Sequence, residues 1–90
     1  MAQRVRVRYS GRVQGVGFRA TALSIARTHP VTGWVRNDPD GAVTLETQGE
    51  AEATREFLEA LGARMGDMIL AADETSVPIR EDEQRFEIRR

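Results

Sequence analysis

Apolar residues repeat with both strand and helix spacing in this sequence, and a turn sequence lies near its middle. Together these patterns predict an α+β fold. Some segments alternate apolar and polar residues, as half-buried strands do, and others place apolar residues at helical spacing. These segments follow one another in the order β-α-β-β-α-β, which favours a ferredoxin-like sandwich. We therefore expect a mainly antiparallel sheet of four to five strands with two helices on one face. The 90 residues suffice for one small domain, predicted to span residues 1–90.

A strand and a helix are predicted in residues 3–28. Residues 3–10 alternate, and one set of their side chains is predicted to face the core: Val5, Val7 and Tyr9. The other set, Arg4, Arg6 and Arg8, is predicted to form a solvated sheet face rather than a nucleic-acid surface, because the net charge is −1 and aromatic residues are few. A helix is predicted over residues 19–28, and Pro30 ends it because the residue before proline disfavours helix.

A hairpin, a second helix and two further strands are predicted in the rest of the chain. Strands at residues 31–37 and 42–48 flank the turn sequence DPDG at residues 38–41. Gly49 is predicted to end the second of these strands, and Gly62 to end a helix that begins at residue 50 and runs to residue 60. Residues 68–77 and 85–88 are predicted strands. In this topology the turn after the first strand lies near the second strand, predicted to be its neighbour, and within reach of residues 34–37.

Composition excludes several kinds of chemistry. The absence of cysteine removes disulfides, thiolate nucleophiles and cysteine metal sites. The one histidine, His29, lies at a predicted helix end and has no partner at metal-ligand spacing, so neither a metal nor a cofactor is expected. No apolar run is long enough to span a bilayer, and the N-terminus leads into a strand pattern. A cytoplasmic protein without membrane or nucleic-acid partners is expected.

The stretch GRVQGVGFR at residues 11–19 lies between the first strand and the first helix. Its glycines allow successive backbone N–H groups to point toward one place, as in an anion-binding nest. The helix N-terminus adds unpaired N–H groups and a positive partial charge. Arg19 adds a permanent charge and a forked donor that suits phosphate oxygens. The stretch therefore predicts an anion site, although a tight connection without a ligand would use glycines too.

Other interpretations of this loop and its surroundings are weaker. Residues 15–20 fit G-x-G-x-x-A, but a dinucleotide site requires a parallel doubly wound sheet and a longer chain. A P-loop is excluded because no Gly-Lys-Ser/Thr ends the stretch. Asp38 and Asp40 are better explained as turn residues than as a catalytic carboxylate pair.

Two motifs together resemble the signatures of the acylphosphatases. The stretch at residues 11–19 resembles the first signature. The sequence GWVRN at residues 33–37, followed by Gly41, Val43 and Gly49 at the family's spacing, resembles the second. Tyr9 stands where the family usually has Val, Ile or Leu, which concerns packing. Asp38 would oppose a dianionic substrate if it faced the site, and we expect it to turn outward.

The resemblance implies a metal-independent hydrolase that cleaves acyl phosphates to carboxylate and inorganic phosphate. It implies two catalytic residues, Arg19 and Asn37, of which Asn37 orients the attacking water. Arg19 would hold the phosphate together with the backbone N–H groups of the loop: Gln14, Gly15, Val16, Gly17 and Phe18. A phosphate or sulfate ion is expected in the site, and the protein is expected to be a monomer.

Two alternatives stay open at this point. A ferredoxin-like domain with an arginine-lined strand could be a non-catalytic module that binds RNA or a regulatory anion. The chain also resembles acylphosphatase domains within larger maturation enzymes, although 90 residues beginning at Met1 favour a free-standing enzyme.

Overall fold

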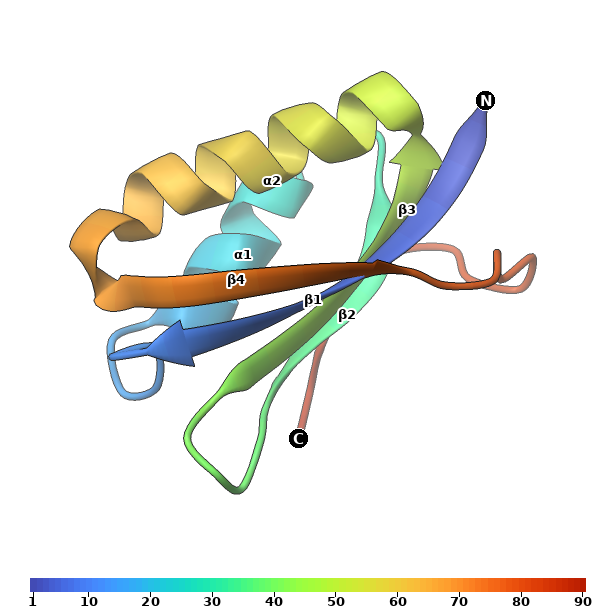
Figure 1. The fold of residues 1–90 in the computed structure, drawn as a ribbon. Coiled ribbons are helices and arrows are strands. Elements are labelled where there is room, and N and C mark those ends of the chain that lie inside the picture. Colours follow the sequence, from blue (N-terminus) through green and yellow to red (C-terminus); the bar gives the residue numbers. More distant parts are fainter.

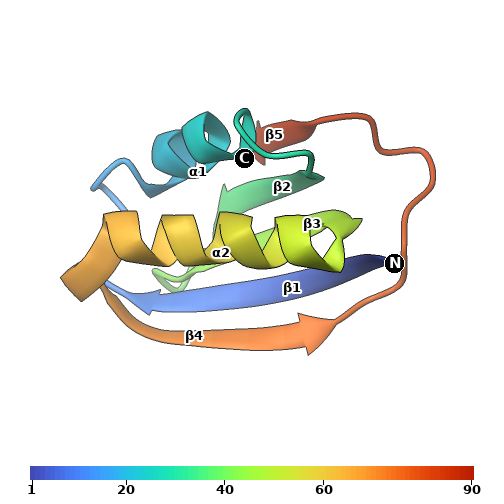
Figure 2. The ribbon, with the colours of Figure 1, turned by 90° about the horizontal axis from the view of Figure 1, so that it is seen from above.

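Both α-helices lie on one face of a five-stranded sheet (Figure 1; Figure 2), which confirms the predicted fold class. The computed structural model describes all 90 residues. The elements in chain order are β1 (Ala2–Gly11), α1 (Phe18–Ala26), β2 (Thr32–Asn37), β3 (Val43–Glu50), α2 (Ala51–Met65), the short 3₁₀ helix η1 (Gly66–Met68), β4 (Ile69–Ser76) and β5 (Phe86–Arg89). Neither α-helix is long and apolar enough to cross a membrane.

The strand order in the sheet is β4-β1-β3-β2-β5. β1 pairs antiparallel with β3 and β4, β2 pairs antiparallel with β3, and β2 pairs parallel with β5. The prediction that the first and second strands are neighbours was therefore wrong, since β3 lies between them. The α1 crossover from β1 to β2 leaves room for one strand, and the β2–β3 hairpin returns the chain through that gap.

The core lies between the sheet and the two helices. The predicted stripe of α2 is buried, namely Thr54, Phe57, Leu58 and Leu61. The helix does not stop near Gly62 as predicted, because it continues to Met65, which is also buried. Burying a large apolar side chain contributes roughly 1.5–3 kcal/mol, which outweighs the cost of about 1 kcal/mol for a glycine inside a helix.

The strand that precedes α2 also runs further than predicted. Gly49 does not end β3, since it pairs with Gln3 and the pairing continues to Glu50 opposite Ala2. Pairing with β1 thus extends β3 through Gly49, although glycine is intrinsically disfavoured in strands.

Arg4 is the clearest departure from the prediction of a solvated arginine face. Arg6 and Arg8 are about half exposed, at 53% and 47% of their side-chain surface, but the Arg4 side chain is at 0%. The segment 77–85 carries the chain from β4 at one edge of the sheet to β5 at the other (Figure 2). This segment covers Arg4, because its Glu83 pairs with the guanidinium. Val77 N–H donates to the Arg4 carbonyl at 3.0 Å, so the segment begins directly beside this residue.

Two carboxylates stabilise the buried Arg4 guanidinium. Arg4 Nε donates to Glu46 Oε1 at 2.7 Å, and Nη1 and Nη2 donate to the two Glu83 oxygens at 2.7 and 3.1 Å. Desolvation alone would lower the pKa of Arg4, but the hydrogen bonds with Glu83 and Glu46 outweigh it and raise the pKa. Arg4 therefore fastens the β4–β5 connection to the sheet.

Candidate active site

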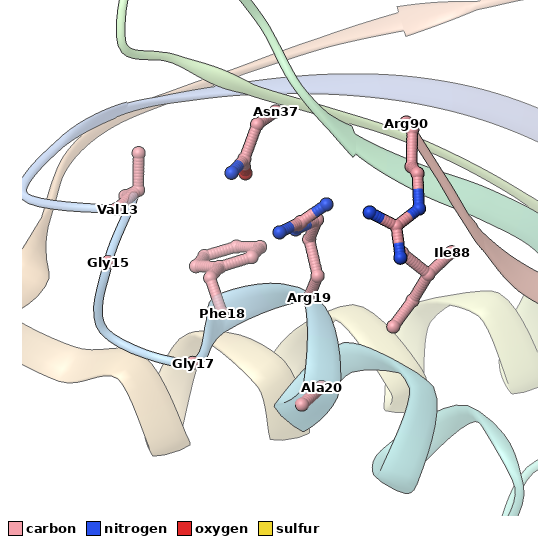
Figure 3. A pocket seen from close by; sticks show the side chains of 9 residues that line it. All are labelled: Val13, Gly15, Gly17, Phe18, Arg19, Ala20, Asn37, Ile88 and Arg90. Carbon is pink, nitrogen blue, oxygen red and sulfur yellow. The ribbon is translucent and has the colours of Figure 1, made fainter.

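The loop between β1 and α1 is held at both ends by buried side chains. Val13 is 0% exposed and Phe18 is 2% exposed, and the Phe18 ring packs against Tyr9 with a centroid separation of 4.9 Å. Between them, Gly15 and Gly17 have φ values of 78° and 80°, in the left-handed region that favours glycine. The loop therefore arches away from the core and returns at Gly17, which is the N-cap of α1 (Figure 3).

The backbone N–H groups from residue 13 to residue 20 have no acceptors within the protein. Arg12 N–H donates to the Met68 carbonyl, and the next backbone donor along the chain is Thr21, which bonds to the Gly17 carbonyl. No N–H group of residues 13–20 donates to any backbone or side-chain acceptor. Gly17 supplies no side-chain cap, and the first turn of α1 contains no acidic residue. The loop and the helix start thus form a continuous run of free donors.

Gln14 ties the loop to the β2–β3 hairpin. Its side-chain Nε2 donates to the carbonyl oxygens of Asp38 and Ala42, at 2.7 and 2.8 Å. These two residues flank the hairpin turn that follows Asn37. The Gln14 side chain therefore connects the two motifs found in the sequence.

Arg19 and Asn37 face one shared pocket, as Figure 3 shows. The pocket has a volume of about 310 Å³ and is lined by Val13, Gly15, Gly17, Phe18, Arg19, Ala20, Asn37, Ile88 and Arg90. Arg19 and Asn37 are half-buried, and neither side chain makes a hydrogen bond or an ion pair with another residue. Of the other predicted site residues, Gly15, Gly17 and Phe18 line the pocket, whereas Gln14 and Val16 do not.

Asp38 turns away from the pocket, as expected. Its carboxylate accepts hydrogen bonds from Arg8 and Arg36, at 3.0 and 3.1 Å, and from Thr44. All three partners lie on the face of the sheet opposite the helices, since their neighbours Tyr9, Val35 and Val43 face the core. The acid beside Asn37 is therefore neutralised on the other side of the sheet.

Ile88 and Arg90 were missed in the sequence. They reach the pocket because β5 pairs parallel with β2, with Val35 opposite Ile88 and Arg36 opposite Arg89. The alternation of residues 85–88 indicated a strand, but it does not show which neighbouring strand β5 pairs with. No acidic residue lines the pocket, and the structure contains no group of three His, Cys, Asp or Glu side chains placed to hold a metal ion.

Comparison with known proteins decides the family. The family model described as Acylphosphatase matches residues 5–88. The chain belongs to the acylphosphatase family. An acylphosphatase from Geobacillus thermodenitrificans is 39% identical over 89 residues, which cover 96% of this chain and 93% of that protein. An acylphosphatase from Salinibacter ruber is 51% identical over 59 residues, a match that covers 66% of this chain and 62% of that relative.

A solved acylphosphatase structure agrees over the whole chain. The crystal structure of the acylphosphatase from Bacillus subtilis superposes with a TM-score of 0.89 at 32% sequence identity, and the match covers 100% of both chains. Acylphosphatases hydrolyse acyl phosphates, so the expected enzyme class is confirmed.

Proposed function

We propose that the pocket binds the phosphoryl group of an acyl phosphate and that Arg19 and Asn37 carry out its hydrolysis. One observation carries this proposal: a loop and helix start whose N–H groups are free, an unpaired guanidinium and an unpaired carboxamide line one pocket. Unpaired donors of this kind are costly in a folded protein unless water or a ligand satisfies them. An anion with several acceptor oxygens satisfies them together.

The phosphoryl group suits these donors. Phosphoryl transfer depends mainly on positioning the group and stabilising the charge on its equatorial oxygens. The amides at the start of α1 point toward a bound anion and add the positive end of the helix dipole. Arg19, which follows Phe18 in the first turn of that helix, donates two parallel hydrogen bonds to phosphoryl oxygens.

Asn37 holds the attacking water. Its carboxamide offers both a donor and an acceptor, so it fixes the orientation of a water molecule next to the phosphorus. The leaving group is a carboxylate whose conjugate acid has a pKa of about 4, so it departs without a general acid. The water proton passes to a phosphoryl oxygen of the substrate. The reaction therefore needs no histidine or cysteine.

The test is release of phosphate from benzoyl phosphate in the presence of a chelator. Asn37→Ala is expected to lower kcat by about 10²–10³, the usual cost of removing one preorganised group, while inorganic phosphate still inhibits competitively. Arg19→Ala is expected to abolish phosphate binding. Arg27→Ala, at the exposed far end of the same helix, is the matched control and should behave as the unmodified protein does.

Three outcomes would contradict this proposal. Normal turnover by Asn37→Ala would remove its assigned role, and phosphate inhibition retained in Arg19→Ala would place the anion elsewhere. Activity that disappears with the chelator and returns with added metal would overturn the metal-free mechanism.

A further inference from the structure

Arg90 brings a second guanidinium into the pocket. The β2–β5 register places Arg36 opposite Arg89, so one step further along both strands Asn37 and Arg90 are neighbours. Phe86 faces the core, and residues 88 and 90 share its side of the strand because successive side chains alternate. Arg89 points to the opposite face, where its guanidinium lies 5.0 Å from the centre of the Trp34 ring. This stacking holds the end of β5 so that residue 90 faces the pocket.

The Arg90 guanidinium has no structural partner. It makes no ion pair or hydrogen bond, unlike Arg4, Arg6, Arg8 and Arg36, which are all paired with carboxylates. No acidic side chain lines the pocket, whereas the guanidinium groups of Arg19 and Arg90 do, in a chain whose net charge is −1. A concave site lined by charge of one sign concentrates ligands of the other sign.

We propose that Arg90 selects acyl phosphates whose acyl group carries a second negative charge, such as a carboxylate. The inference rests on the function proposed above and adds the class of acyl group. In such a substrate the phosphoryl group occupies the loop and Arg19, and the second anion meets Arg90.

The arrangement of the pocket favours contact with the acyl group over contact with the phosphoryl group. The free amides at the start of α1 and Arg19 already supply several donors for the phosphoryl oxygens. Figure 3 shows the Arg90 guanidinium on the side of Arg19 away from Gly15 and Gly17, next to the apolar Ile88. The hydrocarbon part of an acyl group packs on Ile88, and an anionic substituent then lies within reach of the arginine.

The experiment compares 3- and 4-carboxybenzoyl phosphate with the corresponding methylbenzoyl phosphates. These rigid pairs match in size and differ in charge, and the measured quantity is the ratio of their kcat/KM values, corrected for spontaneous hydrolysis. Arg90→Gln is expected to lower the ratio by about tenfold for at least one pair, which corresponds to ~1.4 kcal/mol. Arg90→Lys should keep most of the preference because it keeps the charge, and added salt should weaken the preference in the unmodified protein.

Arg64→Gln is the matched control. Arg64 is exposed at the C-terminal end of α2 and outside the pocket, so this variant makes the same change in net charge and should leave the ratio unchanged. If Arg90→Gln leaves both ratios unchanged, even where kcat/KM falls equally for the charged and the uncharged substrate, Arg90 does not select the acyl group and the inference is wrong. If the unmodified protein hydrolyses none of the four compounds, the proposed function itself fails. The two failures are thus distinguishable.

Discussion

Replacing Glu83 with glutamine is expected to destabilise the protein by about 2 kcal/mol. The Glu83 side chain is 9% exposed and accepts hydrogen bonds from Arg4 Nη1, Arg4 Nη2 and Thr32 Oγ1 at 2.7, 3.1 and 2.7 Å. Glutamine keeps one acceptor oxygen but turns an amide N–H₂ group toward these donors. At least one hydrogen bond to a charged group is lost, and such bonds contribute ~1.5–3 kcal/mol. Arg4 keeps Glu46, so the cost stays below the ~3–5 kcal/mol for a buried charge left without a partner.

The measurement is thermal or urea unfolding at neutral pH, followed by fluorescence of Trp34, the only tryptophan. A loss of ~1 kcal/mol lowers Tm by about 4–8 °C in a domain of this size, so Glu83→Gln should lower it by about 8–16 °C. Asp82→Asn is the control, since this neighbour is 77% exposed and should change stability by less than about 0.5 kcal/mol. If the two variants unfold at the same midpoint, the burial of Arg4 does not depend on Glu83 and the reasoning is refuted.

Three further predictions concern the buried carboxylates, Tyr9 and Gln14. Desolvation favours a raised pKa for Glu46 and Glu83, but hydrogen bonds from their arginine partners outweigh it and lower both values below 4.5. The unfolded chain then binds more protons in acid, so the free energy of unfolding should fall as pH drops below about 4.5, and denaturant midpoints independent of pH there would contradict this. Burial, with a smaller effect of Glu74, raises the pKa of Tyr9, so the tyrosinate absorbance band should stay absent near pH 10 until the protein unfolds; its appearance in folded protein would show that the ring is accessible. Gln14→Ala removes both bonds between the loop and the hairpin and should lower kcat/KM for benzoyl phosphate by up to about 10²-fold through misplacement of the reacting groups, whereas unchanged kinetics would show that the loop holds its position without Gln14.

The elements were predictable from the sequence because their signals are local. The alternation of Val5, Val7 and Tyr9 and the helical spacing of Phe57, Leu58 and Leu61 each describe one buried face, and all six residues are buried. The ends of elements were less predictable, because Gly49 and Gly62 follow their neighbours into a strand and a helix. Pairing and packing decide those ends, and neither is visible in a short stretch of sequence.

What the sequence could not indicate depends on contacts between distant residues. The burial of Arg4 requires Glu83 and a connection without any periodic pattern, so strand alternation alone placed Arg4 in solvent. Ile88 and Arg90 reach the pocket only because β5 pairs with the edge of β2 that β3 leaves free. Arg19 and Asn37, by contrast, lie within the two motifs, and the structure brings them to one pocket although β3 separates β1 from β2.

The walls of the pocket come from three separate parts of the chain: residues 13–20, Asn37, and residues 88 and 90. A partly folded chain that has reached only the β2–β3 hairpin contains the glycine loop and the carboxamide but lacks the wall that β5 supplies. Contacts between residues so far apart form slowly, because the entropy cost of closing a long loop comes before the contact can stabilise the chain. Substrate selectivity should therefore return later during refolding than helical structure does. The delay between the two would report when β5 docks.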